Sequence, residues 1–295
     1  MTYTIVIKLR CNFAVNQSSL KGNIMKKIAF LSFFAVLGLT KLHAQEKLKT
    51  VQEGSFTAPA GVKIDGKLSD WNDKFQAFNK SVKLFYTLAN DDKYLYLIAK
   101  SNDATNIAKI QAGGINLIIN TADKKKDENA FNLTYPVVGR AGGRVGRRYG
   151  VDRTTLSDSA RKEMTAEAHK QFIDAAKEIK VTGFKEITDT LISIYNEYGI
   201  KSAVGYDDKD AIMCEIAIPL KALGLATDQP KEFAYHIVLN GLPLPNGGGF
   251  GGGGGRGGRG GGGRGGRSSS GGVNIDYQDL LTPTDFWGKY TLAKP

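Results

Sequence analysis

Short stretches in which every second residue is apolar, each followed by turn-forming residues, recur through most of the chain. Alternate positions of residues 82–88 are apolar, and Asn90-Asp91-Asp92 follows them. A period of two places the apolar side chains on one face of a β-strand. Similar patterns predict further strands at residues 94–99, 115–120, 131–138, 190–195, 200–206, 211–218, 233–240 and 286–292. Short strands separated by turns at this spacing predict an antiparallel β-sandwich.

One segment follows a different period. Met164, Ala168 and Phe172 recur every four residues, and Ser157 stands where a helix N-cap is favoured. We therefore expect one α-helix over residues 157–180. The predicted fold class is mainly β, an antiparallel β-sandwich with one embedded α-helix.

The start of the chain has the pattern of a targeting signal. Met25-Lys26-Lys27 is followed by an apolar run and then by Leu42-His43-Ala44. A basic start, an apolar stretch of about 7–15 residues and a small residue at the cut are typical of a secretory signal peptide. We interpret residues 25–44 as that peptide, removed after Ala44, and residues 1–24 as an over-long gene start. The predicted protein is then exported, to the periplasm or outside the cell. The alternative is an uncleaved N-terminal anchor, although the run is shorter than a membrane-spanning helix needs.

Two basic segments interrupt the single β-sandwich domain that we expect over residues 61–295, after a lead-in over residues 45–60. The first is an insertion at residues 139–153, and the second is a stretch at residues 246–272 with 18 glycines among its 27 residues. Such a stretch buries too little surface to offset its chain entropy, so we predict a long disordered Gly/Arg loop. Its guanidinium groups are suited to polyanions. The candidate contact residues in this loop are Arg256, Arg259, Arg264 and Arg267, and the alternative is a solvated low-complexity loop with no partner.

Four short motifs, in order along the chain, resemble those of a known family. Residues 64–71 match an I-D-G-x-L-x-x-W opening, and residues 90–97 match an N-D-x-x-Y-L-Y-L hairpin. Residues 215–224 are similar to E-x-x-I-P-L-x-x-L-G, and residues 285–290 resemble the closing strand. Together they resemble the family 9 carbohydrate-binding-module-like domains, which are related to the DOMON sandwiches. The resemblance implies a secreted β-sandwich that binds carbohydrate.

The resemblance also implies which side chains would bind a ligand. Family members bind sugar with aromatic rings, together with polar side chains and structural calcium. Stacking suits sugars, whose C–H faces lie against a π-face. The candidate ligand-binding residues are Trp71, Tyr86 and Trp287, with Arg144, Arg147 and Arg148 of the basic insertion. For each aromatic residue the alternative is packing in the core. Asp65 and Asp70 are the candidate calcium ligands, and turn capping is their alternative role.

The sequence favours binding over catalysis. It contains no G-x-S-x-G motif and no Walker-type loop. Acidic residues are plentiful, but no pair stands out for glycoside hydrolysis, so any link to catalysis would be as an accessory to that reaction. A haem is not expected, because His169, Met164 and Met213 form no pattern.

The leading functional prediction is non-catalytic binding of carbohydrate, as glycan at the cell surface or as an external polysaccharide in carbohydrate catabolism. The alternative is an interaction or scaffold protein whose Gly/Arg loops contact a polyanion or a protein partner. Nucleic acid is disfavoured, because the chain is predicted to be exported and the loop has Phe250 as its one aromatic residue. Salt separates the two readings, since binding through exposed arginines weakens steeply as ionic strength rises.

Overall fold

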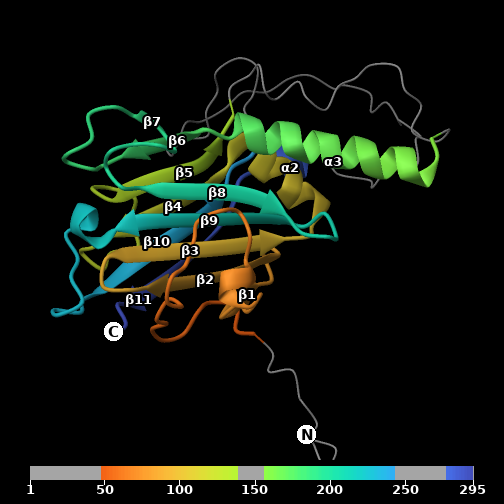
Figure 1. The fold of residues 1–295 in the computed structure, drawn as a ribbon. Coiled ribbons are helices and arrows are strands. Elements are labelled where there is room, and N and C mark those ends of the chain that lie inside the picture. Colours follow the sequence, from red (N-terminus) through yellow and green to blue (C-terminus); the bar gives the residue numbers. More distant parts are fainter. Residues whose placement is uncertain (1–47, 139–155, 243–276, 295) are drawn as a thin grey trace, which may run out of the picture. The chain divides into compact units, whose positions relative to one another are not determined.

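β-Strands are the main regular elements of the computed structural model, which describes residues 48–138, 156–242 and 277–294 (Figure 1). The predicted gene-start extension, the signal peptide, the basic insertion and the Gly/Arg loop lie outside these residues. The described strands form two sheets in which the paired strands run antiparallel. The prediction of a mainly β, sandwich-like fold is therefore confirmed.

Each sheet combines strands from distant parts of the chain. The five-stranded sheet has the order β1-β2-β3-β9-β8, and the six-stranded sheet has the order β11-β10-β4-β5-β6-β7. The strands of the first sheet are β1 (Ala77–Asn79), β2 (Leu84–Asn90), β3 (Tyr94–Ser101), β8 (Lys201–Tyr206) and β9 (Ile212–Pro219). Those of the second are β4 (Ile115–Asn120), β5 (Phe131–Val137), β6 (Glu178–Thr182), β7 (Leu191–Ser193), β10 (Glu232–Leu239) and β11 (Thr284–Thr291). The alternating patterns predicted all of these strands except β1 and β6.

The main core lies between the two sheets. Alternate residues of β10 and β4, such as Tyr235 and Leu117, face the alternate residues of β3 and β9, such as Leu97 and Ile216, in one buried cluster. Fully burying each such aliphatic side chain contributes about 1.5–3 kcal/mol. The polar ends of the buried tyrosines are paired as well, because the hydroxyl groups of Tyr86 and Tyr235 lie 2.9 Å apart.

A second apolar cluster covers the outer face of the five-stranded sheet. Residues 56–75, which we call the N-terminal strap, place Leu68 and Trp71 against Tyr96, Ile98 and Met213 of β3 and β9. The strap explains why β3 is apolar on both faces, since each of its faces meets another layer. Within the strap, Ser69–Trp71 forms a single 3-10 turn.

The predicted helix is present but shorter than expected. Helix α3 (Asp158–Ala175) begins after Ser157, whose Oγ accepts a hydrogen bond from the backbone N–H of Ala160 at 3.3 Å. The prediction extended this helix to residue 180, but residues 178–182 form β6. The four-residue spacing of Ile179 from Ala175 concealed the two-residue alternation of Ile179 and Val181, both of which are buried in the core.

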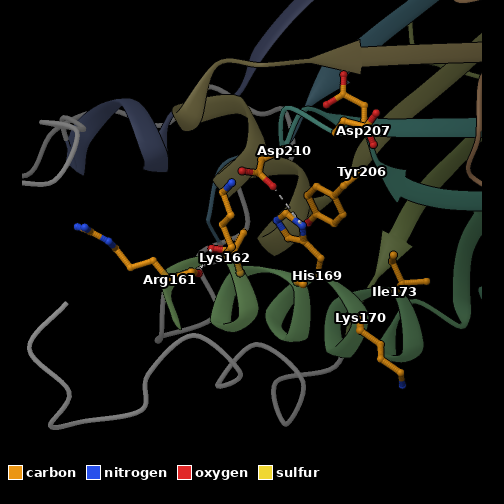
Figure 2. A pocket seen from close by; sticks show the side chains of 11 residues that line it. Arg161, Lys162, His169, Lys170, Ile173, Tyr206, Asp207 and Asp210 are labelled. Atoms are coloured by element: carbon orange, nitrogen blue, oxygen red, sulfur yellow. Dashed lines mark hydrogen bonds and ion pairs between the residues drawn. The ribbon is translucent and has the colours of Figure 1, made fainter. Parts of the chain in front are cut away.

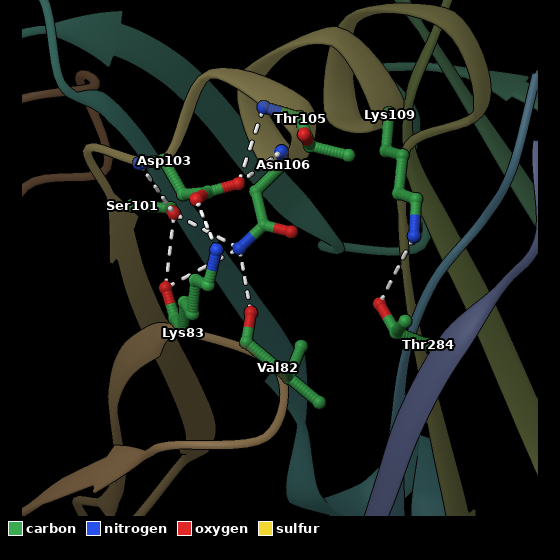
Figure 3. Close-up of polar contacts among 8 residues, drawn as sticks. All are labelled: Val82, Lys83, Ser101, Asp103, Thr105, Asn106, Lys109 and Thr284. Carbon is green, nitrogen blue, oxygen red and sulfur yellow. Dashed lines mark hydrogen bonds and ion pairs between the residues drawn. The ribbon is translucent and has the colours of Figure 1, made fainter. Parts of the chain in front are cut away.

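The prediction of a single helix is wrong, because α2 (Ala104–Gly113) also lies between two strands, and a short helix, α4 (Tyr277–Leu281), precedes β11. The carboxylate of Asp103 caps α2, and its Oδ2 lies 2.7 Å from the Lys83 ammonium (Figure 3). The Asn106 amide donates to the Val82 carbonyl oxygen at 2.6 Å. These contacts fasten the first turn of α2 to the chain just before β2. No helix of the described segments is long and apolar enough to cross a membrane.

The first and last described parts of the fold meet at one place. The Asn90 side chain accepts from the backbone N–H of Ala293 at 2.7 Å and donates to its carbonyl oxygen at 3.0 Å. The Ser55 hydroxyl donates to the Thr291 carbonyl oxygen at 2.7 Å. The residue just before the strap, the last residue of β2 and the end of β11 are therefore joined by hydrogen bonds.

Candidate functional site

Two of the three predicted ligand-binding aromatic residues are in the interior. Tyr86 is 0% exposed and its hydroxyl bonds to Tyr235 and accepts from the backbone N–H of Gln52. Trp71 is 3% exposed and is packed by the strap, to which it belongs, against the five-stranded sheet. Neither ring offers a face to a ligand, so the structure corrects the ligand-binding prediction for these two residues in favour of core packing.

A buried carboxylate fixes Trp71 in place. Glu215 Oε1 accepts a hydrogen bond from the Trp71 indole at 3.0 Å, and Oε2 accepts from the backbone N–H groups of Asp65 and Gly66 at 3.0 and 2.8 Å. Burial raises the pKa of Glu215 to about 7, although these hydrogen bonds act to lower it. Glu215 thus joins two of the sequence motifs, and its position at the head of the E-x-x-I-P-L motif was the signal available for it.

The two predicted calcium ligands cap backbone turns. Asp65 Oδ1 accepts from the N–H of Lys67 at 2.9 Å, and Asp70 Oδ2 accepts from the N–H of Lys63 at 3.0 Å. Turn capping therefore describes what both carboxylates do in this structure. In the described part of the chain, no group of three or more His, Cys, Asp or Glu side chains is placed to hold a metal ion.

Trp287 differs from the other two aromatic residues, because it lies on the outer face of the six-stranded sheet. It pairs across β11 and β10 with His236, while its neighbour Phe286 points to the core. The indole and imidazole rings stack with their centroids 4.1 Å apart and their planes 12° from parallel. The imidazole is 8% exposed, whereas Trp287 is only partly buried. One face of the indole is thus supported and part of the ring reaches solvent.

Two carboxylates hold the imidazole ring from either side. His236 Nε2 lies 2.8 Å from Asp285 Oδ2, and Nδ1 lies 3.0 Å from Asp127 Oδ1. Asp285 belongs to β11, two residues before Trp287, whereas Asp127 belongs to the segment that links β4 to β5. Sequence reasoning considered His236 together with His169 for a haem and set it aside as one residue of a strand flanked by Tyr235 and Ile237. Its partners could not be read from the chain, because Asp127 lies more than a hundred residues away.

The segment of residues 121–130, which we call the β4–β5 loop, has two further contacts that hold it in place. Lys289 Nζ lies 2.8 Å from Asp123 Oδ2, and the Asn120 amide at the end of β4 donates to the Lys126 carbonyl oxygen at 2.8 Å. Since Lys289 and His236 lie on the outer face of β11 and β10, the loop borders the same face as Trp287.

Polar side chains continue from Trp287 across the sheet. The strand register places Asp285, Val238, Asn116 and Thr134 side by side across β11, β10, β4 and β5. The Oδ1 atom of Asn116 is buried and receives no hydrogen bond from any described residue. Buried polar atoms are normally paired, so this acceptor is an exception among the described residues. We call Trp287, His236, Asp127, Asp285 and Asn116 the Trp287 face.

A separate groove of about 760 Å³ lies between α3 and the turn after β8 (Figure 2). On its floor the His169 ring stacks on Tyr206 at 3.5 Å, and burial lowers the pKa of His169. Much of its charge is already paired, because Arg161 contacts Asp158 and Lys170 contacts Asp174. Of the residues considered for haem, His169 lines this groove, whereas Met213 packs under the strap.

The remaining predicted contact residues cannot be placed. The basic-insertion residues Arg144, Arg147 and Arg148 and the loop residues Arg256, Arg259, Arg264 and Arg267 lie outside the described residues. Comparisons of the chain with known protein families, with curated proteins and with solved structures found no match.

Proposed function

We propose that this chain is an exported, non-catalytic carbohydrate-binding protein, and that the Trp287 face holds the sugar. The observation that carries the proposal is the supported indole, a partly exposed ring stacked on His236 at 4.1 Å. A ring already held in place loses little conformational freedom when a ligand stacks on it. The fold-level resemblance and the targeting pattern at residues 25–44 support the same reading.

The neighbours of Trp287 have the chemistry that sugar recognition needs. An apolar ring binds the C–H face of a pyranose, and acceptors and donors at its edge bind the hydroxyl groups. Asp285 is exposed beside the ring, and Asn116 and Thr134 continue the polar surface along the sheet.

The test is a glycan array probed with the exported form of the protein at about 100 mM and about 400 mM salt. Neutral glycans should bind at both salt concentrations, and Trp287→Ala should weaken that binding about 30-fold or more, because stacking and apolar contact are both lost. The matched control is Tyr195→Ala, which removes an aromatic ring that is 81% exposed on a different part of the surface. Equal affinity of the wild type and Trp287→Ala would refute the proposal.

Binding to anionic probes alone, lost at the higher salt, would support the second candidate function. In that case the nine arginines of residues 140–153 and 246–272 would make the protein a scaffold that contacts a polyanion or an acidic partner. Trp287→Ala would then leave binding unchanged. The same array thus separates the two functions.

A further inference from the structure

We propose that Asp127 and Asp285 act as positioning residues that hold the His236 ring against Trp287 while both ring nitrogens carry protons, so that sugar binding weakens as the pH rises. This inference rests on the proposed function of the Trp287 face and adds its regulation. The contacts of the His236 ring with Asp127, Asp285 and Trp287 exist whether or not a sugar binds, so the positioning of the ring can be tested separately from sugar binding.

The hydrogen-bond geometry requires two donors on one imidazole. Asp285 Oδ2 and Asp127 Oδ1 lie 2.8 and 3.0 Å from the two ring nitrogens. An ionised carboxylate only accepts hydrogen bonds, and neutral imidazole has a single N–H. Both contacts are therefore satisfied together only by the imidazolium form, which also places a cation against the face of the Trp287 indole.

The groups around the ring determine which contact fails first. From β11 the ring meets Asp285 and Trp287, and from the β4–β5 loop it meets Asp127. Its cross-strand neighbour on β4 is the uncharged Ile118. Asp285 is fixed within a strand ladder, whereas Asp127 is carried by a loop whose other ion pair on this face is Asp123 with Lys289.

When the His236 imidazolium loses one proton to water, it can no longer donate a hydrogen bond to both Asp127 and Asp285. The deprotonated nitrogen presents a lone pair to a carboxylate oxygen, and two acceptors facing each other repel. Because Asp127 belongs to the loop, we expect its contact to open while the Asp285 contact is kept. The stacked ring then loses one of its two supports and its charge, and the indole loses its fixed position.

The experiment measures affinity for the tightest-binding neutral glycan between about pH 5.5 and about pH 8.5, the range in which histidine changes charge. The wild type should lose about tenfold in affinity across this range, the equivalent of one charge-assisted hydrogen bond. Asp127→Asn should bind with a nearly flat pH profile, because an amide either accepts from an N–H or donates to a lone pair. Asp228→Asn, an exposed carboxylate elsewhere, should keep the wild-type profile.

A second readout needs no glycan. An imidazolium stacked on an indole quenches its fluorescence, so the Trp287 emission of the wild type should rise with pH, and Asp127→Asn should reduce the change. The variant Trp287→Phe reports Trp71 alone and provides the background. If Asp127→Asn does not fold, Asp285→Asn applies the same test to the other contact.

The outcomes separate the two proposals. A flat pH profile in the wild type, or an unchanged profile in Asp127→Asn, would overturn the pH dependence and leave sugar binding intact. Fluorescence that responds to pH and to Asp127→Asn, with no glycan bound at any pH, would support the positioning of His236 and overturn the proposed function.

Discussion

The outer faces of the two sheets each carry one tryptophan, and the two residues have opposite surroundings. Trp71 is enclosed by the strap and bonded through its indole N–H to the buried Glu215. Trp287 lies on the other sheet, where it stacks on His236 and remains partly exposed. Both belong to segments that resemble family motifs. Trp71 packs because it is itself part of the layer that covers a sheet face, whereas Trp287 lies on a strand whose outer face leaves it partly exposed.

The carboxylates beside the two tryptophans differ in the same way. Glu215 is 0% exposed and accepts three hydrogen bonds from the strap. Asp127 and Asp285 are largely solvent-exposed and share one imidazole ring. A buried, fully bonded carboxylate fixes its surroundings, whereas exposed ones are free to meet a ligand. The strap side therefore provides stability, and we assign binding to the Trp287 face.

The largest expected difference between the two faces is in stability. Trp71→Ala should lower the free energy of unfolding by about 3–5 kcal/mol, because it empties a packed site and leaves Glu215 without one donor. Trp287→Ala should lower it by about 1 kcal/mol, since its ring is partly exposed. Denaturant titrations of both variants measure these values. Similar losses in the two variants would contradict the comparison.

A smaller effect is expected at the strap turn. Gly66 has a φ of +82°, and a Cβ there would lie 2.7 Å from the Val204 carbonyl oxygen. Gly66→Ala should cost about 3 kcal/mol from strain and steric overlap together. Gly54→Ala is the matched control, because Gly54 has a φ of +78° with no atom within 4 Å of the added Cβ. It should cost about 1 kcal/mol. Equal losses would mean that the strap does not pack tightly on β8.

Stability should also depend on pH through Glu215. Burial raises the pKa of this carboxyl from its ordinary value near 4.5 to about 7 in the folded protein. The folded state therefore holds a proton that the unfolded state releases, and stability falls as the pH rises from about 4.5 to about 7. The expected loss is at most about 3 kcal/mol, and Glu215→Gln should not show it. A wild-type profile that matches Glu215→Gln would show that the three hydrogen bonds offset burial.

The sequence predicted most of the strands because apolar alternation is a local signal. It did not predict β6, since Ile179 fits a helical spacing from α3 as well as an alternation with Val181. It did not predict α2 either, because only Ile110 and two polar residues, Asn106 and Lys109, are buried in that helix. Where helical and strand periods overlap over a few residues, contacts with distant strands decide the outcome.

The candidate site was predicted in part. Trp287 could be named from its motif, but nothing in the motif distinguished it from Trp71 and Tyr86, whose burial depends on the strap and on the opposite sheet. His236 had no local signal, because its two carboxylates come from the β4–β5 loop and from β11. Contacts between residues so far apart in sequence follow from strand order and register, which alternation alone does not specify.

The Asn90 side chain, at the end of β2, binds the backbone of Ala293, and the Ser55 hydroxyl donates to the carbonyl oxygen of Thr291. The residue that leads into the strap and the residues that end the last strand are therefore held at one place on the fold. Fraying of the C-terminal end would loosen the start of the strap as well, so the two segments should open together rather than one at a time.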